Sequence, residues 1–68
     1  MSVKNQGRIV RIIADGRLGV IYRRQSPVGM KFIVNLIDEN HKPILNEQGK
    51  NKVVFKLSEE LETIGFQD

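Results

Sequence analysis

Short runs of β-branched and aliphatic residues, each bounded by Gly, Pro, Asp or Asn, recur along this 68-residue chain. Apolar residues at helical spacing are nearly absent, whereas short apolar runs between turn residues are typical of strands. The runs cover residues 8–13, 18–23, 31–37 and 52–57, and a shorter apolar stretch follows at 63–66. The sequence therefore predicts an all-β fold with five strands.

The connections between these runs differ in length and character. Asp15-Gly16 is a tight-turn signal, because glycine tolerates the positive φ that hairpin turns require. Gly19 lies inside the second run, where a glycine indicates a bulge, a bend or a closely approaching backbone. The polar segment 38–51 is long for a loop in a compact domain. It predicts a protruding hairpin attached to the domain through Ile44 or Leu45, and SEELE at 58–62 predicts one helical turn.

Alternation along the third and fourth runs predicts which side chains enter the core. Phe32, Val34 and Leu36 share one face of a strand. The same period of two places three residues of the fourth run on a common face, which we expect to be the inner one: Val53, Phe55 and Leu57. With Phe32, Phe55 and Phe66 assigned to the core, Tyr22 is the one aromatic residue left for a surface, and an aromatic groove for proline-rich peptides is disfavoured.

The order of these elements predicts one domain over residues 1–68, with 1–6 as a flexible N-terminus. Four strands, one helical turn and a short fifth strand are the order of a five-stranded SH3-like barrel, here with a long hairpin-like loop between strands three and four. The alternative is an OB-type barrel, which usually carries a helix between its third and fourth strands. A Pro43-interrupted polar segment is a poor helix, so we favour the SH3-like barrel.

Charge is distributed unevenly along the chain. Residues 1–37 contain seven basic residues and one acid, whereas residues 38–68 contain four basic and seven acidic residues. This asymmetry indicates a positive face that attracts an anionic partner, although basic residues also guard sheet edges in proteins without such a partner.

The first hairpin, GRIVRIIADGRLGVIYRR, combines two apolar strands with a glycine-containing basic turn. Together with the strand that follows, residues 7–37, it resembles the KOW motif of transcription elongation factors and ribosomal proteins, with Gly16 and Gly19 as its glycines and Arg17 as its turn base. It is also similar to small uncharacterised bacterial proteins in which an ADGRxGVIY-type hairpin precedes an IGF ending. The KOW resemblance implies binding to RNA or to a protein of a nucleic-acid machine. The long insertion after the third strand departs from a minimal KOW unit.

The residues do not favour catalysis, a metal or a cofactor. The chain has no cysteine, and its single histidine, His41, lies in a polar loop, so a zinc site with about four ligands is excluded. Adjacent carboxylates at Asp38-Glu39 and Glu59-Glu60 point in different directions on extended backbone and suit loops and caps. Gly16-x-x-Gly19 lacks the Lys-Ser/Thr of a phosphate-binding loop. We therefore expect a protein that is not an enzyme.

The remaining interpretation is a non-catalytic binding module. We expect it to bind RNA or DNA, or a protein of a nucleic-acid machine, through a basic face on the first hairpin, where arginine suits phosphate and an exposed tyrosine stacks on a base. The expected nucleic-acid-binding residues are Arg8, Arg11, Arg17, Tyr22, Arg23, Arg24 and Lys31. The alternative is a protein-interaction adaptor that uses the 38–51 arm and apolar outer-face residues such as Ile33 and Val54. Without a leader or spanning segment we expect a cytoplasmic protein that does not bind membranes, and the oligomeric state stays open.

Overall fold

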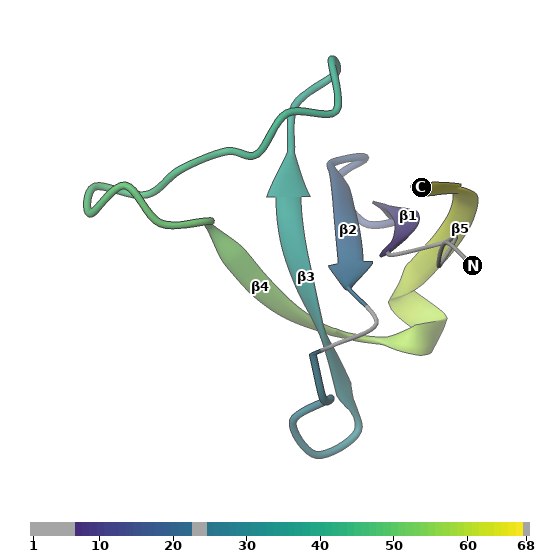
Figure 1. The fold of residues 1–68 in the computed structure, drawn as a ribbon. Coiled ribbons are helices and arrows are strands. Elements are labelled where there is room, and N and C mark those ends of the chain that lie inside the picture. The colour runs from purple at the N-terminus through teal and green to yellow at the C-terminus, as the bar shows by residue number, and fades with distance from the viewer. Residues whose placement is uncertain (1–6, 23–24, 68) are drawn as a thin grey trace, which may run out of the picture.

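The computed structural model describes residues 7–22 and 25–67, which form one antiparallel sheet of five strands (Figure 1). The elements along the chain are β1 (Gly7–Ile12), β2 (Leu18–Tyr22), β3 (Lys31–Ile37), β4 (Val53–Leu57), the 3-10 turn η1 (Ser58–Glu60) and β5 (Leu61–Gln67). Their order across the sheet is β4-β3-β2-β1-β5. The predicted all-β class, the five strands and the helical turn before the last strand are confirmed. The prediction of a flexible tail at residues 1–6 falls outside the described residues.

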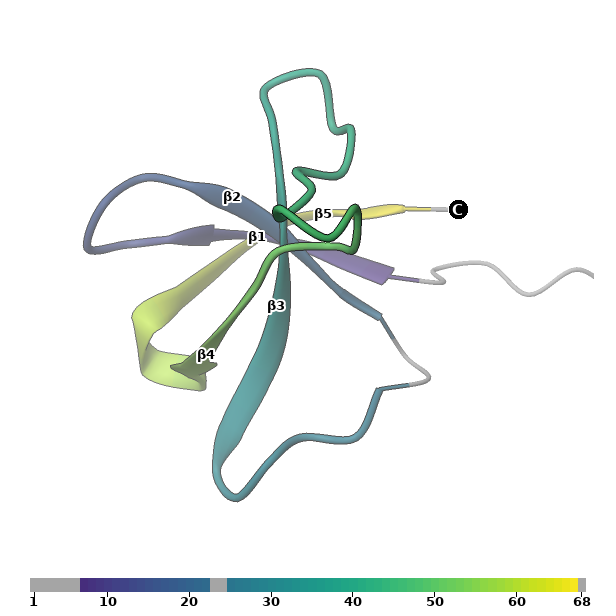
Figure 2. The ribbon, with the colours of Figure 1, turned by 90° about the vertical axis from the view of Figure 1, so that its left-hand side faces the viewer.

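The sheet is strongly coiled but open. β4 curves across the lower end of β3 and leads through η1 into β5 (Figures 1 and 2). β4 and β5 form the two edges of the sheet, and within residues 7–22 and 25–67 no ladder joins them. Coiling of this kind follows from the right-handed twist of the strands. It brings side chains from both halves of the sheet together on the inner face.

The core is aliphatic and lies on both faces of the central strands. On the inner face, four fully buried residues form one cluster: Val10, Ile12, Val34 and Leu36. The half-buried Ile21, Ile44, Val54 and Leu61 pack against it. On the other face, Ile9, Val20 and Ile37 form a second buried cluster with Leu18 and Tyr22 at its margin. The sequence does not decide whether Val20 or Ile21 faces inward, because a bulge at Gly19 would exchange them. In the structure Ile21 packs on the inner cluster and Val20 belongs to the second cluster on the opposite face.

The core prediction for the fourth strand is wrong. Across the β3–β4 ladder Val34 pairs with Val54, while Ile33 pairs with Phe55. Residues paired across a ladder share a face, so Val54 is the inward residue of β4. Phe55 is 46% exposed and Val53 39% exposed on the outer face. Alternation correctly predicts which residues of this run share a face. Because V-V-F carries apolar residues on both faces, however, alternation does not show that Val54 rather than Phe55 points inward.

Gly19 allows β2 and β3 to approach each other closely. A Cβ on Gly19 would overlap the Cγ1 atom of Val34 and lie 3.1 Å from the carbonyl oxygen of Asn35. Of the three meanings of a glycine within a strand, the close approach of another backbone is therefore confirmed. Gly16 has φ 77° in the turn between β1 and β2, as the Asp-Gly pair predicts.

The long connection between β3 and β4 contains two turns of the same design. In the first, one carboxylate oxygen of Asp38 accepts hydrogen bonds from the backbone N–H groups of Asn40 and Lys42. In the second, the amide oxygen of Asn46 accepts from the N–H groups of Gln48 and Lys50. Together these turns form the arm: in Figure 1 the first turn projects above β3, and the second extends to the left before β4 begins. The predicted attachment is confirmed for Ile44, which packs on the inner cluster, whereas Leu45 is exposed.

Candidate functional site

Arg8 lies on the inner face of β1, where the sheet opens. The ladders place Arg8 between Ile21 of β2 and Phe66 of β5, so these three side chains form a row across the sheet. The guanidinium carbon of Arg8 lies 5.5 Å from the centroid of the Phe32 ring, which is within the range of a cation–π contact. The Nε atom of Arg8 is buried, and no described residue accepts a hydrogen bond from it. A buried donor without a partner is unusual in a folded protein.

A hollow opens beside this arginine because β2 and β3 separate. Their ladder ends at the pair Val20–Asn35, beyond which the two strands diverge. The hollow has a volume of about 360 Å³. Its walls come from β1, β2, β5, the start of β3 and the loop between β2 and β3: Gly7, Arg8, Ile21, Tyr22, Gln25, Pro27, Phe32 and Phe66. We call it the arginine hollow.

Aromatic rings line the arginine hollow, contrary to the prediction that the phenylalanines fill the core. Phe66 is 59% exposed and Phe32 is half-buried, so the assignment of all three phenylalanines to the core is wrong. The objection that no aromatic residues remain for a binding groove therefore fails. Tyr22 is half-buried rather than fully exposed. It packs against the second cluster and also lines the hollow.

A second, more polar hollow of about 410 Å³ adjoins the first. It is lined by Tyr22, Gln25, Asn35 and Asn51, and it shares Tyr22 and Gln25 with the arginine hollow. Asn35 is 4% exposed. Its Nδ2 atom donates to the carbonyl oxygen of Val20 at 3.0 Å and to Oε1 of Gln25 at 2.7 Å. We call this second hollow the amide hollow; no motif in the sequence marks its three carboxamide residues, Gln25, Asn35 and Asn51.

Among the residues that the structure describes, the basic residues of the predicted face do not lie together. Arg11 lies within 4.0 Å of Glu62 on β5, and Arg17 at the hairpin tip donates through Nε to Asp15 at 2.9 Å. Arg8 and Tyr22 lie at the opposite end of the hairpin, about 17 Å from the tip at the usual rise along a strand. The structure therefore brings Arg8 and Tyr22 together and separates them from Arg11 and Arg17.

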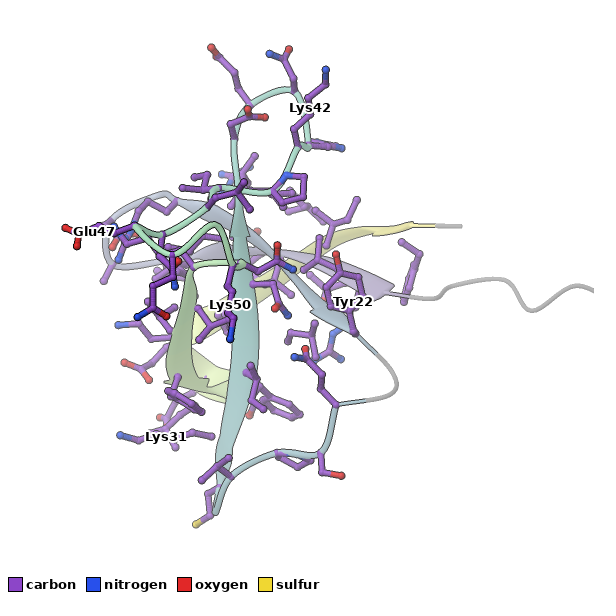
Figure 3. The ribbon with its side chains drawn as sticks, turned by 60° about the vertical axis from the view of Figure 1, so that its left-hand side comes forward. Tyr22, Lys31, Lys42, Glu47 and Lys50 are labelled. Carbon is purple, nitrogen blue, oxygen red and sulfur yellow. The ribbon has the colours of Figure 1, made fainter. Side chains whose placement is uncertain are left out.

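The three other predicted residues are placed differently. Lys31 begins β3 and is exposed. Lys31 does not line the arginine hollow, and in Figure 3 it lies well apart from Tyr22. Arg23 and Arg24 lie outside the described residues.

Asp15 carries the one shifted carboxyl at the hairpin tip. The backbone N–H of Arg17 donates to Asp15 Oδ1 at 3.0 Å, and this bond is the main reason why the pKa of Asp15 lies below its usual range. Partial desolvation opposes the shift, and the Arg17 side chain adds to it. The hairpin tip therefore satisfies its own charges with an internal ion pair.

Within the described residues no three His, Cys, Asp or Glu side chains lie close enough together to hold a metal ion. Over the same residues, no helix is long and apolar enough to cross a membrane. Comparisons of the chain with models of protein families, with characterised proteins and with solved structures found no match.

Proposed function

We propose that the protein is a non-catalytic module that binds single-stranded RNA or DNA at the arginine hollow. The observation that carries this proposal is the combination of Arg8 with the aromatic rings of Phe32, Phe66 and Tyr22 around one open hollow. Single-strand-binding proteins combine positive charge for the backbone with aromatic rings on which bases stack. The guanidinium of Arg8 carries further N–H donors besides the buried Nε, in the planar arrangement that suits a phosphate.

Arg11 and Arg17, which the sequence predicts as phosphate contacts near the hairpin tip, are not direct contacts in this proposal. Their charges are already opposed by Glu62 and Asp15, so phosphate binding there would compete with internal ion pairs. Surface ion pairs are worth little and exchange readily. We therefore assign these two arginines a general electrostatic role and assign the contacts with the strand to the other end of the hairpin.

For the architecture, we infer an SH3-like barrel whose seam lies between β4 and β5. The supporting features are the strand order β4-β3-β2-β1-β5, the 3-10 turn Ser58–Glu60 before the last strand, and the coil of the sheet. The KOW resemblance of residues 7–37 agrees with such a barrel and with an RNA partner. The cysteine-free composition suits a reducing compartment, so we propose a cytoplasmic location.

Fluorescence anisotropy with labelled single-stranded RNA, single-stranded DNA and duplex DNA tests the function. We expect single strands to bind more tightly than the duplex, because only unpaired bases can stack. Affinity should fall linearly with the logarithm of salt concentration between about 50 and about 200 mM, since neutralised phosphates release counterions.

Phe66→Ala and Phe55→Ala form a matched pair in this assay. Both residues are exposed phenylalanines on edge strands, but only Phe66 lines the arginine hollow. Phe66→Ala should weaken single-strand binding about tenfold, in keeping with the loss of one stacked base, and Phe55→Ala should leave it unchanged. No binding to any oligonucleotide at low salt would refute the proposed function.

A second candidate function is a protein-interaction adaptor, and one feature of β4 favours it. The carbonyl of Lys52 accepts a hydrogen bond from Leu36 on the β3 side. Because pairing alternates along a strand, the main-chain groups of Val53 and Phe55 point to the free edge. An exposed edge with exposed apolar side chains accepts a strand from another protein. Affinity capture with Val53→Lys, which charges this edge, would lose a partner bound there and would leave oligonucleotide binding unchanged.

A further inference from the structure

The carboxamides of Asn35 and Gln25 form a relay whose orientation is determined by the backbone. The relay begins at the carbonyl oxygen of Val20, which can only accept a hydrogen bond. Asn35 must therefore turn its NH₂ group toward Val20, and the second proton of that group goes to Oε1 of Gln25. Because Asn35 is almost fully buried, this orientation is held by packing as well as by hydrogen bonds.

Two polar atoms of this relay remain without a described partner. Both protons of Asn35 Nδ2 are used, which leaves its Oδ1 as an acceptor. Gln25 accepts through Oε1, which leaves its Nε2 with protons to donate. Among the described residues, no side chain or main-chain group donates to the first atom or accepts from the second. The relay thus places a fixed acceptor and a donor at the wall of the amide hollow.

The position of these two atoms beside the arginine hollow indicates what kind of ligand they would bind. Tyr22 and Gln25 line both hollows, with Arg8 and two phenylalanine rings on one side and the amides on the other. A nucleotide presents the same sequence of chemistries, with an anionic phosphate at one end and a base edge of donors and acceptors at the other. Asn and Gln carboxamides are common partners of such edges.

We propose that Gln25 and Asn35 bind the edge of one unpaired nucleobase and set the base preference of the single-strand site. The inference rests on the proposed function, because it concerns the same strand. In uracil, Gln25 donates to the 4-carbonyl and Asn35 accepts from the N3–H group. In a duplex the pairing edge of each base is occupied by its partner, so this contact also favours single strands.

The variant Gln25→Glu tests the inference because it changes a donor into an acceptor and keeps the size of the side chain. A glutamate still accepts from Asn35 Nδ2, but it accepts from the 4-amino group of cytosine and repels the 4-carbonyl of uracil. The measured quantity is the ratio of dissociation constants for short oligo-uridylate and oligo-cytidylate. We expect Gln25→Glu to shift this ratio about tenfold toward cytosine relative to the wild-type protein.

The ratio separates the base contact from simple charge repulsion. Both oligomers carry the same phosphates, so a new negative charge weakens both equally. Gln48→Glu makes the same change of charge in the exposed second turn of the arm and should leave the ratio unchanged. A Gln25→Glu ratio equal to that of the wild type, with wild-type binding intact, would refute the base contact and keep the proposed function. Absence of wild-type binding would remove the proposed function and this inference with it.

A measurement on the wild-type protein avoids any dependence on the fold of the variant. In ¹H–¹⁵N spectra, the side-chain NH₂ signals of Gln25 should shift when oligo-uridylate is added, because Nε2 gains an acceptor. The NH₂ signals of Gln48, which lies on the arm, should stay in place. Unmoved Gln25 signals at saturation would contradict the inference even if the oligonucleotide binds.

Discussion

Val34 and Val54 face each other across the β3–β4 ladder on the inner face of the sheet, and Phe55, the next residue of β4, pairs with Ile33 on the opposite face. The inward-facing residue at this point of β4 is thus a valine, and the largest side chain of the strand, that of Phe55, lies toward solvent. This arrangement predicts an unusual order of stabilities for two neighbouring substitutions.

Val54→Ala should destabilise the protein by about 1.5–2 kcal/mol, because it removes two methyl groups that pack on the buried cluster. Phe55→Ala should cost less than about 1 kcal/mol, well below the about 3–5 kcal/mol typical of a buried phenylalanine, because its ring is 46% exposed. Urea unfolding of both variants gives the comparison. A larger loss for Phe55→Ala would show that β4 has the opposite facing.

Gly19→Ala should be strongly destabilising. The new methyl group would overlap Val34 on the neighbouring strand and crowd the carbonyl of Asn35, and overpacking of this kind typically costs about 1–3 kcal/mol. Gly65→Ala is the matched control, since a Cβ on Gly65 meets no atom within 4 Å. Thermal unfolding should show a lower midpoint for Gly19→Ala and an unchanged or slightly higher one for Gly65→Ala. Equal midpoints would mean that β2 and β3 do not approach as closely as described.

Arg8→Met should separate binding from stability. The substitution keeps an unbranched apolar side chain over Phe32 and removes the buried Nε that has no described partner. Loss of the cation–π contact destabilises the folded state by about 0.5–1 kcal/mol, while removal of an unsatisfied buried donor stabilises it by about 1 kcal/mol or more. The free energy of unfolding should therefore stay within about 1 kcal/mol of the wild type, whereas single-strand affinity should fall. A loss of stability above about 2 kcal/mol would assign Arg8 a structural role instead.

The hairpin tip should contribute a small pH dependence. The N–H of Arg17 lowers the pKa of Asp15 in the folded state, against about 3.9 for an unperturbed aspartate. The stabilisation is therefore fully present above about pH 4 and is lost as the pH falls through the lowered folded pKa. In Asp15→Asn the difference in stability between about pH 7 and about pH 2.5 should be smaller than in the wild type. An NMR titration in which Asp15 titrates at or above the usual value would contradict this account.

The elements of this fold could be predicted because turn residues and alternation act locally. The predicted third strand, residues 31–37, coincides with β3, and Asp15-Gly16 forms its turn with positive φ. Facing could not be predicted where both sides of a strand are apolar, as in β4, whereas the predicted inner face of β3 is confirmed for Val34 and Leu36, which are buried in the inner cluster. Alternation shows which residues share a face but not which face is inner when the neighbouring strands are unknown.

The candidate site was only partly predictable for a related reason. Arg8 and Tyr22 were singled out by charge and residue type, and the structure brings them to one hollow. Phe32 and Phe66 were missed because phenylalanine was assigned to the core by default. The signal that could have found them is the supply of aliphatic residues in the first three strands, which is sufficient to fill both clusters without a phenylalanine. Asn35 and Gln25 meet only through the divergence of β2 and β3, a tertiary feature with no local signature.

His41 offers a last prediction because the arm contains its own control. His41 has φ 64° in the first turn, and Gly49 occupies the equivalent position of the second turn with φ 77°. A residue with a Cβ pays about 1–2 kcal/mol for this left-handed conformation, whereas glycine adopts it freely. His41→Gly should therefore relieve strain, although the greater freedom of glycine in the unfolded chain offsets part of the gain.

We expect a net stabilisation of up to about 1 kcal/mol for His41→Gly. Gly49→His, which makes the reverse exchange at the equivalent position, should lose about 1 kcal/mol or more. Urea unfolding of both variants measures the difference directly, and both turns are exposed, so packing contributes little to either value. If both substitutions destabilised the protein equally, the His41 side chain would have to make a contact that compensates for its backbone conformation. The two turns would then be equivalent in their main chain but not in their side-chain contacts.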